Sequence, residues 1–124
     1  MNKDTIFASL TKNNKTAISI IRVSGPQTKT IIKKFLKKGP KSKEINIRNI
    51  YTTNGDFIDK GVILFFSEPS SPTGEDVLEF HVHGSLAIIK KIELELNKIK
   101  YVREAEPGEF TKRALQNDKI DLLQ

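Results

Sequence analysis

The chain contains no cysteine, and it has no apolar run long enough to cross a membrane. Without cysteine there can be no disulfide framework, no thiolate metal site and no thiol redox chemistry. The opening residues, MNKDTIFASLTKNNK, are too polar for a secretory signal, and a membrane span needs about 20 consecutive apolar residues. These absences favour a soluble, cytoplasmic protein with no membrane partner. The length of 124 residues fits one ordinary domain.

A phosphate-binding loop is also missing. The segments GPQTKT and GPKSK bring glycine and lysine together, but neither has the G-x-x-x-x-G-K-[ST] spacing with which backbone amides wrap phosphates. We therefore expect no nucleoside triphosphate site within these residues. No local motif suggests a Ser-His-Asp arrangement either, so no catalytic residue is assigned.

Basic charge is concentrated in the first part of the chain. Met1 to Arg48 carries 12 basic and 2 acidic residues, and the remainder carries 9 and 13, so the two parts have net charges of +10 and −4. Much of the excess lies in KTIIKKFLKKGPKSK, where an apolar helical stripe faces away from the lysines. The stripe consists of Ile31, Ile32, Phe35 and Leu36. The lysines would form either the solvated face of an amphipathic helix or a phosphate-facing patch for RNA.

The apolar pattern predicts alternating strands and helices with no linker between two cores. Ser24-Gly25-Pro26 supplies a cap and an early proline for a helix that runs to about Lys38. The expected strands are DTIFASL, AISIIRVSG, NIRNIYTT, FIDKGVILFFSE, DVLEFHVH and a short one near YVREAE, and the other helices are SLAIIKKIELELNKI and EFTKRALQN. An Asn54-Gly55-Asp56 turn would join two of the strands. The pattern indicates an α+β fold of mostly antiparallel strands covered by helices.

The chain stops in what reads as the first turns of a helix, KIDLLQ, which Asp118 can cap. We therefore expect residues 1–117 to form one domain and residues 118–124 to begin a following helical domain.

The segment GEDVLEFHVHG places Glu79, His81 and His83 on one face of a predicted strand, because successive side chains point to opposite faces. A carboxylate and two imidazoles could hold a metal, do acid–base work or bind an organic ligand. Residues four apart on a strand are separated by roughly 13 Å, so Glu79 and His83 cannot bind one ion through a straight strand. A metal site would need a bulge, and we assign none.

Arg22 interrupts the apolar run AISIIRVSG. A charged residue in a buried strand needs a partner or an opening to solvent. Arg22 would therefore form an internal ion pair, extend its charged end to solvent, or bind an anion at the edge of a pocket.

Three blocks, IIRVSGP, SPTGEDVLEFHVHG and EAEPGEFTKRALQNDKIDL, closely resemble the N-terminal domain of the tRNA modification GTPases of the MnmE family, also called TrmE. Their order and spacing agree, and with the opening DTIFA the resemblance covers essentially the whole chain.

The resemblance implies a fold similar to the folate-binding domain of the glycine cleavage T-protein. It also implies that this domain forms a homodimer and binds 5-formyl-tetrahydrofolate or 5,10-methylene-tetrahydrofolate. In the family a helical domain and a GTPase domain follow, and the latter uses GTP with Mg²⁺ and K⁺. Together with the flavoprotein MnmG (GidA), the whole enzyme modifies carbon 5 of the wobble uridine of certain tRNAs. The fragment alone is expected to lack GTPase activity.

The family's folate-binding residues match Arg22, Glu79 and Lys119. A carboxylate can accept two parallel hydrogen bonds from the amino group and ring N–H of a pterin, so Glu79 is the residue expected to hold the pterin. Arg22 and Lys119 would complement a formyl oxygen or the anionic glutamate tail. His83 is expected to shape the pocket or the turn that follows, and His81 has no assigned role.

Two features depart from the family pattern. The family commonly has a Gly-Arg-Gly type of loop where this chain reads TKNNKTAIS, a change that covers Asn13 to Ala17. It often has His-Gly-Gly after the carboxylate strand, where Ser85 follows Gly84 here. A serine at this point is expected to alter a close approach of ligand to backbone.

Two other functions stay open. One is a stand-alone basic RNA-binding module that uses the lysines from Lys29 to Lys43. The other is a folate-dependent aminomethyltransferase, which would need a further catalytic carboxylate.

Overall fold

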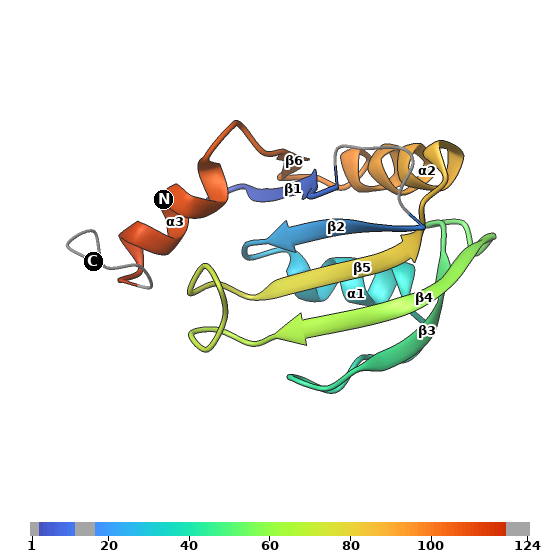
Figure 1. Cartoon of the computed structure of the whole chain (residues 1–124), viewed down its shortest axis with the longest axis horizontal. Coiled ribbons are helices and arrows are strands. Elements are labelled where there is room, and N and C mark those ends of the chain that lie inside the picture. Colours follow the sequence, from blue (N-terminus) through green and yellow to red (C-terminus); the bar gives the residue numbers. More distant parts are fainter. Residues whose placement is uncertain (1–2, 12–16, 119–124) are drawn as a thin grey trace.

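The computed structural model describes residues 3–11 and 17–118, which form one sheet with helices beside it (Figure 1). The strands lie in the order β3-β4-β5-β2-β1-β6. They span Thr5–Ser9 (β1), Ile18–Ser24 (β2), Asn46–Tyr51 (β3), Phe57–Phe66 (β4), Val77–His83 (β5) and Val102–Glu104 (β6). The helices of the described residues span Thr28–Phe35 (α1), Leu86–Asn97 (α2) and Glu109–Gln116 (α3).

Neighbouring strands run antiparallel except β1 and β6, which are parallel. The chain leaves β5, passes through α2 and returns to the edge of the sheet as β6, a crossover that permits parallel pairing. The predicted α+β class with mostly antiparallel strands is confirmed. The likeness to the glycine cleavage T-protein stays a prediction, as does the domain boundary at residue 117, since residues 119–124 lie outside the described ones.

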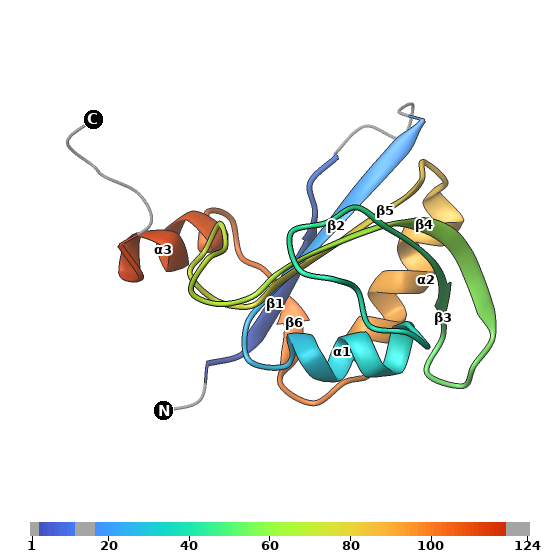
Figure 2. The same cartoon turned by 90° about the horizontal axis from the view of Figure 1, so that it is seen from below.

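The two faces of the sheet have different surroundings. Figure 2 shows α1 and α2 on the same side of the sheet. On β5, Leu78, Phe80 and Val82 point to this side and are at most 2% exposed. They pack with Phe7, Ile21, Val23, Ile31, Phe35, Ile63, Ile89, Ile92 and Leu96 in one apolar core. The opposite face, which we call the open face, carries Arg22 and Glu79.

The apolar stripe predicted for α1 is confirmed, since Ile31, Phe35 and Leu36 are buried and Ile32 is partly buried. The helix is shorter than predicted and ends at Phe35 instead of near Lys38. Leu36 takes an extended backbone conformation (φ −125°, ψ 126°) that keeps its side chain in the core. Among the described residues, no helix has the length and apolar character needed to cross a membrane.

The predicted capping role of Ser24 is wrong. Ser24 is the last residue of β2, and α1 begins at Thr28 without a side-chain cap. The Ser24 hydroxyl donates instead to the Glu75 carboxylate at 2.8 Å and lies 2.8 Å from the Thr73 hydroxyl. Because its single proton goes to Glu75, the Thr73 hydroxyl must donate to Ser24.

Glu75 connects the loop between β4 and β5 to α3, which lie side by side in both views. Arg113 on α3 donates to both Glu75 oxygens at 3.2 and 3.3 Å, and each residue is at most 8% exposed. Arg113 also lies 3.4 Å from Glu109. Glu109 in turn binds Arg103 on β6 at 2.6 Å, and hydrogen bonds from Arg103 lower the pKa of Glu109 to about 2. These ion pairs fix α3 against the end of the sheet.

Gly74 in this loop has φ of +84°, which favours glycine, and a Cβ there would lie 2.5 Å from Cβ of Asn117. Asn117 donates to the Thr73 carbonyl at 3.0 Å. The motif SPTGED therefore packs directly on the end of α3.

A second buried carboxylate holds the β3–β4 hairpin. Glu95 on α2 is 1% exposed, and it accepts hydrogen bonds from the backbone N–H and hydroxyl of Thr53 at 2.8 and 3.0 Å. Lys98 donates to its other oxygen at 2.5 Å. The predicted turn is confirmed, with Gly55 at φ of +91°.

Replacing Arg113 by Met should destabilise the protein by roughly 3 to 5 kcal/mol, because Glu75 would be left as a buried charge without its ionic partner. Urea unfolding of the 124-residue chain measures this loss. Lys112→Met changes the exposed neighbour on the same helix and should alter the unfolding free energy by less than about 0.5 kcal/mol. Equal losses in the two variants would contradict the assigned role.

Stability should fall as the pH drops through the range in which Glu95 takes up a proton. Hydrogen bonds from Lys98 and Thr53 lower the pKa of Glu95 to about 2. The folded state therefore favours the ionised form, and this contribution, on the order of 3 kcal/mol, is present above about pH 4.5 and disappears toward pH 2. Urea unfolding at several pH values should show the gap between the wild type and Glu95→Gln closing over this range.

Glu93 provides a control of opposite sign. Burial, with the nearby Glu104 carboxylate, raises the pKa of Glu93. Its ionisation therefore opposes folding, and Glu93→Gln should gain stability at neutral pH and lose that advantage as the pH falls.

A constant difference in unfolding free energy between the wild type and Glu95→Gln from pH 5 to pH 2 would refute the account of Glu95.

Candidate functional site

Arg22 and Glu79 lie opposite each other on the open face, because β2 and β5 pair antiparallel in the register that joins these two residues. The Arg22 guanidinium donates from Nε to Oε2 of Glu79 at 2.8 Å, and its Nη2 atom lies 2.6 Å from the same oxygen in an ion pair. The ion pair is one of the three possibilities that the sequence left open for Arg22.

His81 contacts the other oxygen of the same carboxylate. Its Nε2 atom lies 2.9 Å from Oε1 of Glu79. An ionised carboxylate only accepts hydrogen bonds, so Nε2 of His81 must carry the proton. Burial favours a higher pKa for Glu79, but the hydrogen bonds from His81 and Arg22 outweigh it and hold the pKa below its usual value. Glu79 is thus a charged, oriented acceptor near neutral pH.

The third side of this site is formed by α3. Phe110, in its first turn, places its ring centroid 5.9 Å from the central carbon of the Arg22 guanidinium. The side chains of Arg22, His81 and Glu79 keep 25%, 21% and 9% of their surface exposed. A ligand can therefore reach the carboxylate from the open face between the strands and α3.

A shallow hollow of about 360 Å³ adjoins this group on the open face. Ile18, Ile47 and Val62 form much of its wall, and His81 and His83 line it as well. His81 therefore belongs both to the carboxylate group and to the hollow. The arrangement offers one oriented carboxylate beside apolar surface, which suits a flat ligand with paired N–H donors.

The row of Glu79, His81 and His83 separates in the structure. His83 is exposed, and its Nδ1 atom lies 3.0 Å from the Asp59 carboxylate on β4. Burial raises the pKa of Asp59, but hydrogen bonds from His83 outweigh this and lower it overall. Within residues 3–11 and 17–118, no three His, Asp or Glu side chains are grouped so that they could hold one metal ion.

The remaining predicted site features are only partly described by the structure. Lys119 and the segment 12–16, which includes most of the departing loop, are outside the described residues. Ser85 stands at the N-cap of α2 with an extended backbone and forms no side-chain cap. The backbone N–H of His83 donates to Asp59 at 3.0 Å, just before this turn.

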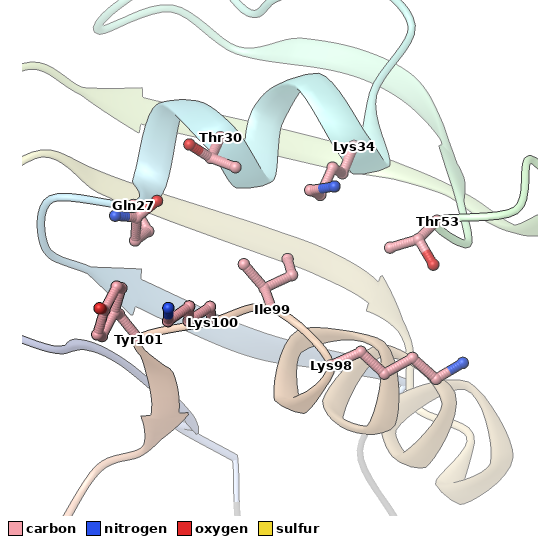
Figure 3. A pocket seen from close by; sticks show the side chains of 8 residues that line it. All are labelled: Gln27, Thr30, Lys34, Thr53, Lys98, Ile99, Lys100 and Tyr101. Carbon is pink, nitrogen blue, oxygen red and sulfur yellow. The ribbon is translucent and has the colours of Figure 1, made fainter.

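A larger hollow than the one beside His81 lies elsewhere. It measures about 470 Å³ and lies between α1 and the turn from α2 to β6, on the helix side of the sheet (Figure 3). None of Arg22, Glu79 and His81 lines it. The chemistry of the carboxylate group, not the size of the hollow, identifies the candidate ligand site.

Sequence reasoning missed two contributors to the site. His81 shares the predicted strand face with Glu79, and their spacing of two residues could have indicated the contact. Phe110 gave no such signal, because only the packing of α3 at the end of the sheet brings it to Arg22.

The relatives found by comparison with known proteins are tRNA modification GTPases. The chain is 43% identical to the mitochondrial tRNA modification GTPase gtpbp3 of Dictyostelium discoideum, over 98% of the chain and 25% of the relative. It is 48% identical to the tRNA modification GTPase MnmE of Wigglesworthia glossinidia brevipalpis, over 98% of the chain and 27% of the relative. The corresponding protein of Pelagibacter ubique is 46% identical, over 96% and 27%.

The chain thus spans about a quarter of the length of the curated relatives it matches. The model of the family described as GTP-binding protein TrmE N-terminus matches residues 5–119. This match extends from β1 past the end of α3 and includes every residue described above for the site. The chain therefore belongs to the family of the TrmE N-terminus.

Proposed function

We propose that this chain is the reduced-folate-binding and dimer-forming part of a cytoplasmic tRNA modification GTPase. With MnmG (GidA), the whole protein would use a folate one-carbon unit to modify carbon 5 of the wobble uridine of certain tRNAs. These 124 residues contain no phosphate-binding loop, so in this proposal they supply no GTP hydrolysis. The main support is Glu79, a largely buried carboxylate that Arg22 and His81 orient on the open face.

The carboxylate of Glu79 has the capacity that pterin recognition requires. A carboxylate offers about four acceptor positions. Two nitrogens of Arg22 lie against Oε2, and His81 takes one position on Oε1, so Oε1 keeps a free acceptor position. A pterin amino group and ring N–H would bind both oxygens when Nη2 of Arg22 turns from Oε2 toward the ligand, while the bonds from Nε of Arg22 and from His81 remain. The folate would be 5-formyl-tetrahydrofolate or 5,10-methylene-tetrahydrofolate, and it would supply the one-carbon unit.

Arg22 and Lys119 are proposed to complement the formyl oxygen or the glutamate tail. Phe110 covers one side of Arg22 and limits its contact with water. A guanidinium held in this way keeps its charge and loses little freedom when it binds an anion.

Glu79→Gln should weaken binding of 5-formyl-tetrahydrofolate to the 124-residue chain by about 10-fold to 100-fold. The variant keeps the shape but loses the charge and one of the two acceptor atoms, at a cost typical of a charged hydrogen bond. Isothermal titration calorimetry measures the affinity, and a thermal melt of each variant checks folding.

Asp59→Asn is the matched control, since Asp59 is also a buried carboxylate on this sheet that binds a histidine. Its affinity for the folate should stay within about twofold of the wild type. Asp59 bonds only the end of β5 at His83, four residues and roughly 13 Å along the strand from Glu79, and has no hydrogen bond to Arg22, Glu79 or His81. Unchanged affinity in a folded Glu79→Gln variant would exclude the assigned role of Glu79.

Homodimer formation is proposed to use the open face. This face exposes large apolar side chains, with Ile18 at 57% and Ile47 at 60% exposed. Both line the hollow beside His81. Pairing of two open faces would cover this apolar surface and place the folate site near the interface.

Sedimentation equilibrium of the 124-residue chain should therefore give the mass of a dimer. The double variant Ile18→Asp/Ile47→Asp should shift the mass to that of a monomer, because it places charge in an apolar contact. Leu94→Asp is the control, since Leu94 is 61% exposed on α2. A wild-type monomer would rule out this interface. A dimer that persists in the double variant would rule it out as well.

A further inference from the structure

The lysines of the α1 region form a basic surface on the opposite side of the sheet from Glu79. Thr28 to Lys43 contains seven lysines and no acidic residue. All seven are exposed, and none takes part in the ion pairs found among residues 3–11 and 17–118. Their charge is therefore available to an external anion. We call this region the α1 surface.

Hollows beside α1 add basic side chains from other elements. The hollow of about 470 Å³ combines Lys34 of α1 with Lys98 and Lys100 from the turn that leads to β6. In Figure 3, Lys34 points from α1 toward this turn. A second hollow, of about 380 Å³, combines Lys37 and Lys38 with Arg48 on β3. These basic side chains thus line hollows in the surface, in addition to those that extend from α1 into solvent.

A tyrosine lies beside lysine in each of these hollows. The Lys100 ammonium is 5.1 Å from the ring centroid of Tyr101, which is 50% exposed. The Lys37 ammonium is 4.3 Å from the ring centroid of Tyr51. The backbone of Tyr101 has φ of +67°, so its position is set by the turn that ends α2. A half-exposed ring in a basic hollow is a stacking platform for an unpaired base.

We propose that the α1 surface binds RNA, with the lysines on backbone phosphates and Tyr101 stacked on a base that is not paired. This proposal rests on the proposed function, because the RNA bound by part of a tRNA modification GTPase would be tRNA. Lysine contacts to phosphate carry affinity without sequence, so this surface positions the RNA and does not select it. The second hollow reaches the β3 edge of the sheet, where Ile47 and Lys60 line it and also the hollow beside His81. None of Arg22, Glu79 and His81 lines either basic hollow, so both ligands can be bound at once.

The structure favours RNA over an anionic membrane. A helix that lies on a membrane needs a free apolar face to insert. The apolar face of α1 is already in the core, with Ile31 and Phe35 at 0% exposed. The half-exposed Tyr101 within a basic hollow fits a base between phosphates better than it fits lipid chains.

Fluorescence anisotropy with a labelled tRNA anticodon stem-loop tests the proposal on the 124-residue chain. The variant Lys34→Glu/Lys37→Glu/Lys38→Glu should lose at least about tenfold in affinity. Its slope of log affinity against log salt should fall by about 0.7 to 0.9 for each phosphate that the protein no longer neutralises. Tyr101→Leu should weaken binding severalfold and leave the salt slope unchanged, because stacking releases no counterions.

The control, Lys90→Glu/Lys91→Glu/Lys112→Glu, makes the same change in net charge with exposed lysines of α2 and α3. It should lose clearly less affinity than the α1 variant. Equal losses would mean that only net charge matters and would overturn the proposal. Tighter binding of the chain to vesicles of phosphatidylcholine and phosphatidylserine than to the stem-loop would overturn it as well.

Folate titration of the same variants separates this proposal from the preceding one. The α1 variant should keep its affinity for 5-formyl-tetrahydrofolate, which also shows that it folds. Glu79→Gln should keep its affinity for the stem-loop. Loss of RNA affinity in Glu79→Gln at the level of the α1 variant would contradict two separate surfaces.

Discussion

The antiparallel register of β2 and β5 controls the chemistry of the open face. It sets Arg22 opposite Glu79, and each residue supplies the charge that makes the other tolerable in a largely buried strand. His81, two residues after Glu79 on the same face of β5, brings its imidazole to the same carboxylate. A shift by one residue would turn Glu79 into the core and Phe80 toward solvent. The geometry of the site therefore depends on the core packing that fixes this pairing.

The end of the sheet is fixed by a different set of contacts. Glu75, Arg113 and Glu109 join the loop before β5 to α3, and Gly74 allows the close approach. These residues belong to the motifs SPTGED and PGEFTKRA, which therefore have a structural reason to occur together in one chain. Through α3 they also determine where Phe110 lies relative to Arg22.

The two sides of the sheet carry opposite chemistry. The open face presents a carboxylate among apolar side chains, whereas the helix side presents lysines around hollows. A small ligand with N–H donors and a polyanion would not compete for the same groups. If both proposals hold, this division would let one small domain bind a one-carbon donor and nucleic acid through different groups.

The sequence by itself determined the alternation of strands and helices, the placement of Glu79 with the histidines on one strand face, and the lysine face of α1. These features depend on local periodicity, which side-chain geometry within one element decides. It could not determine the partners of Ser24, which reads as a helix cap and in fact binds a loop 49 residues later. Nor could it place Phe110 on Arg22, or identify Glu79 as the ionic partner of Arg22. Those outcomes depend on which distant elements meet, and only the pairing of β2 with β5 and the docking of α3 decided them.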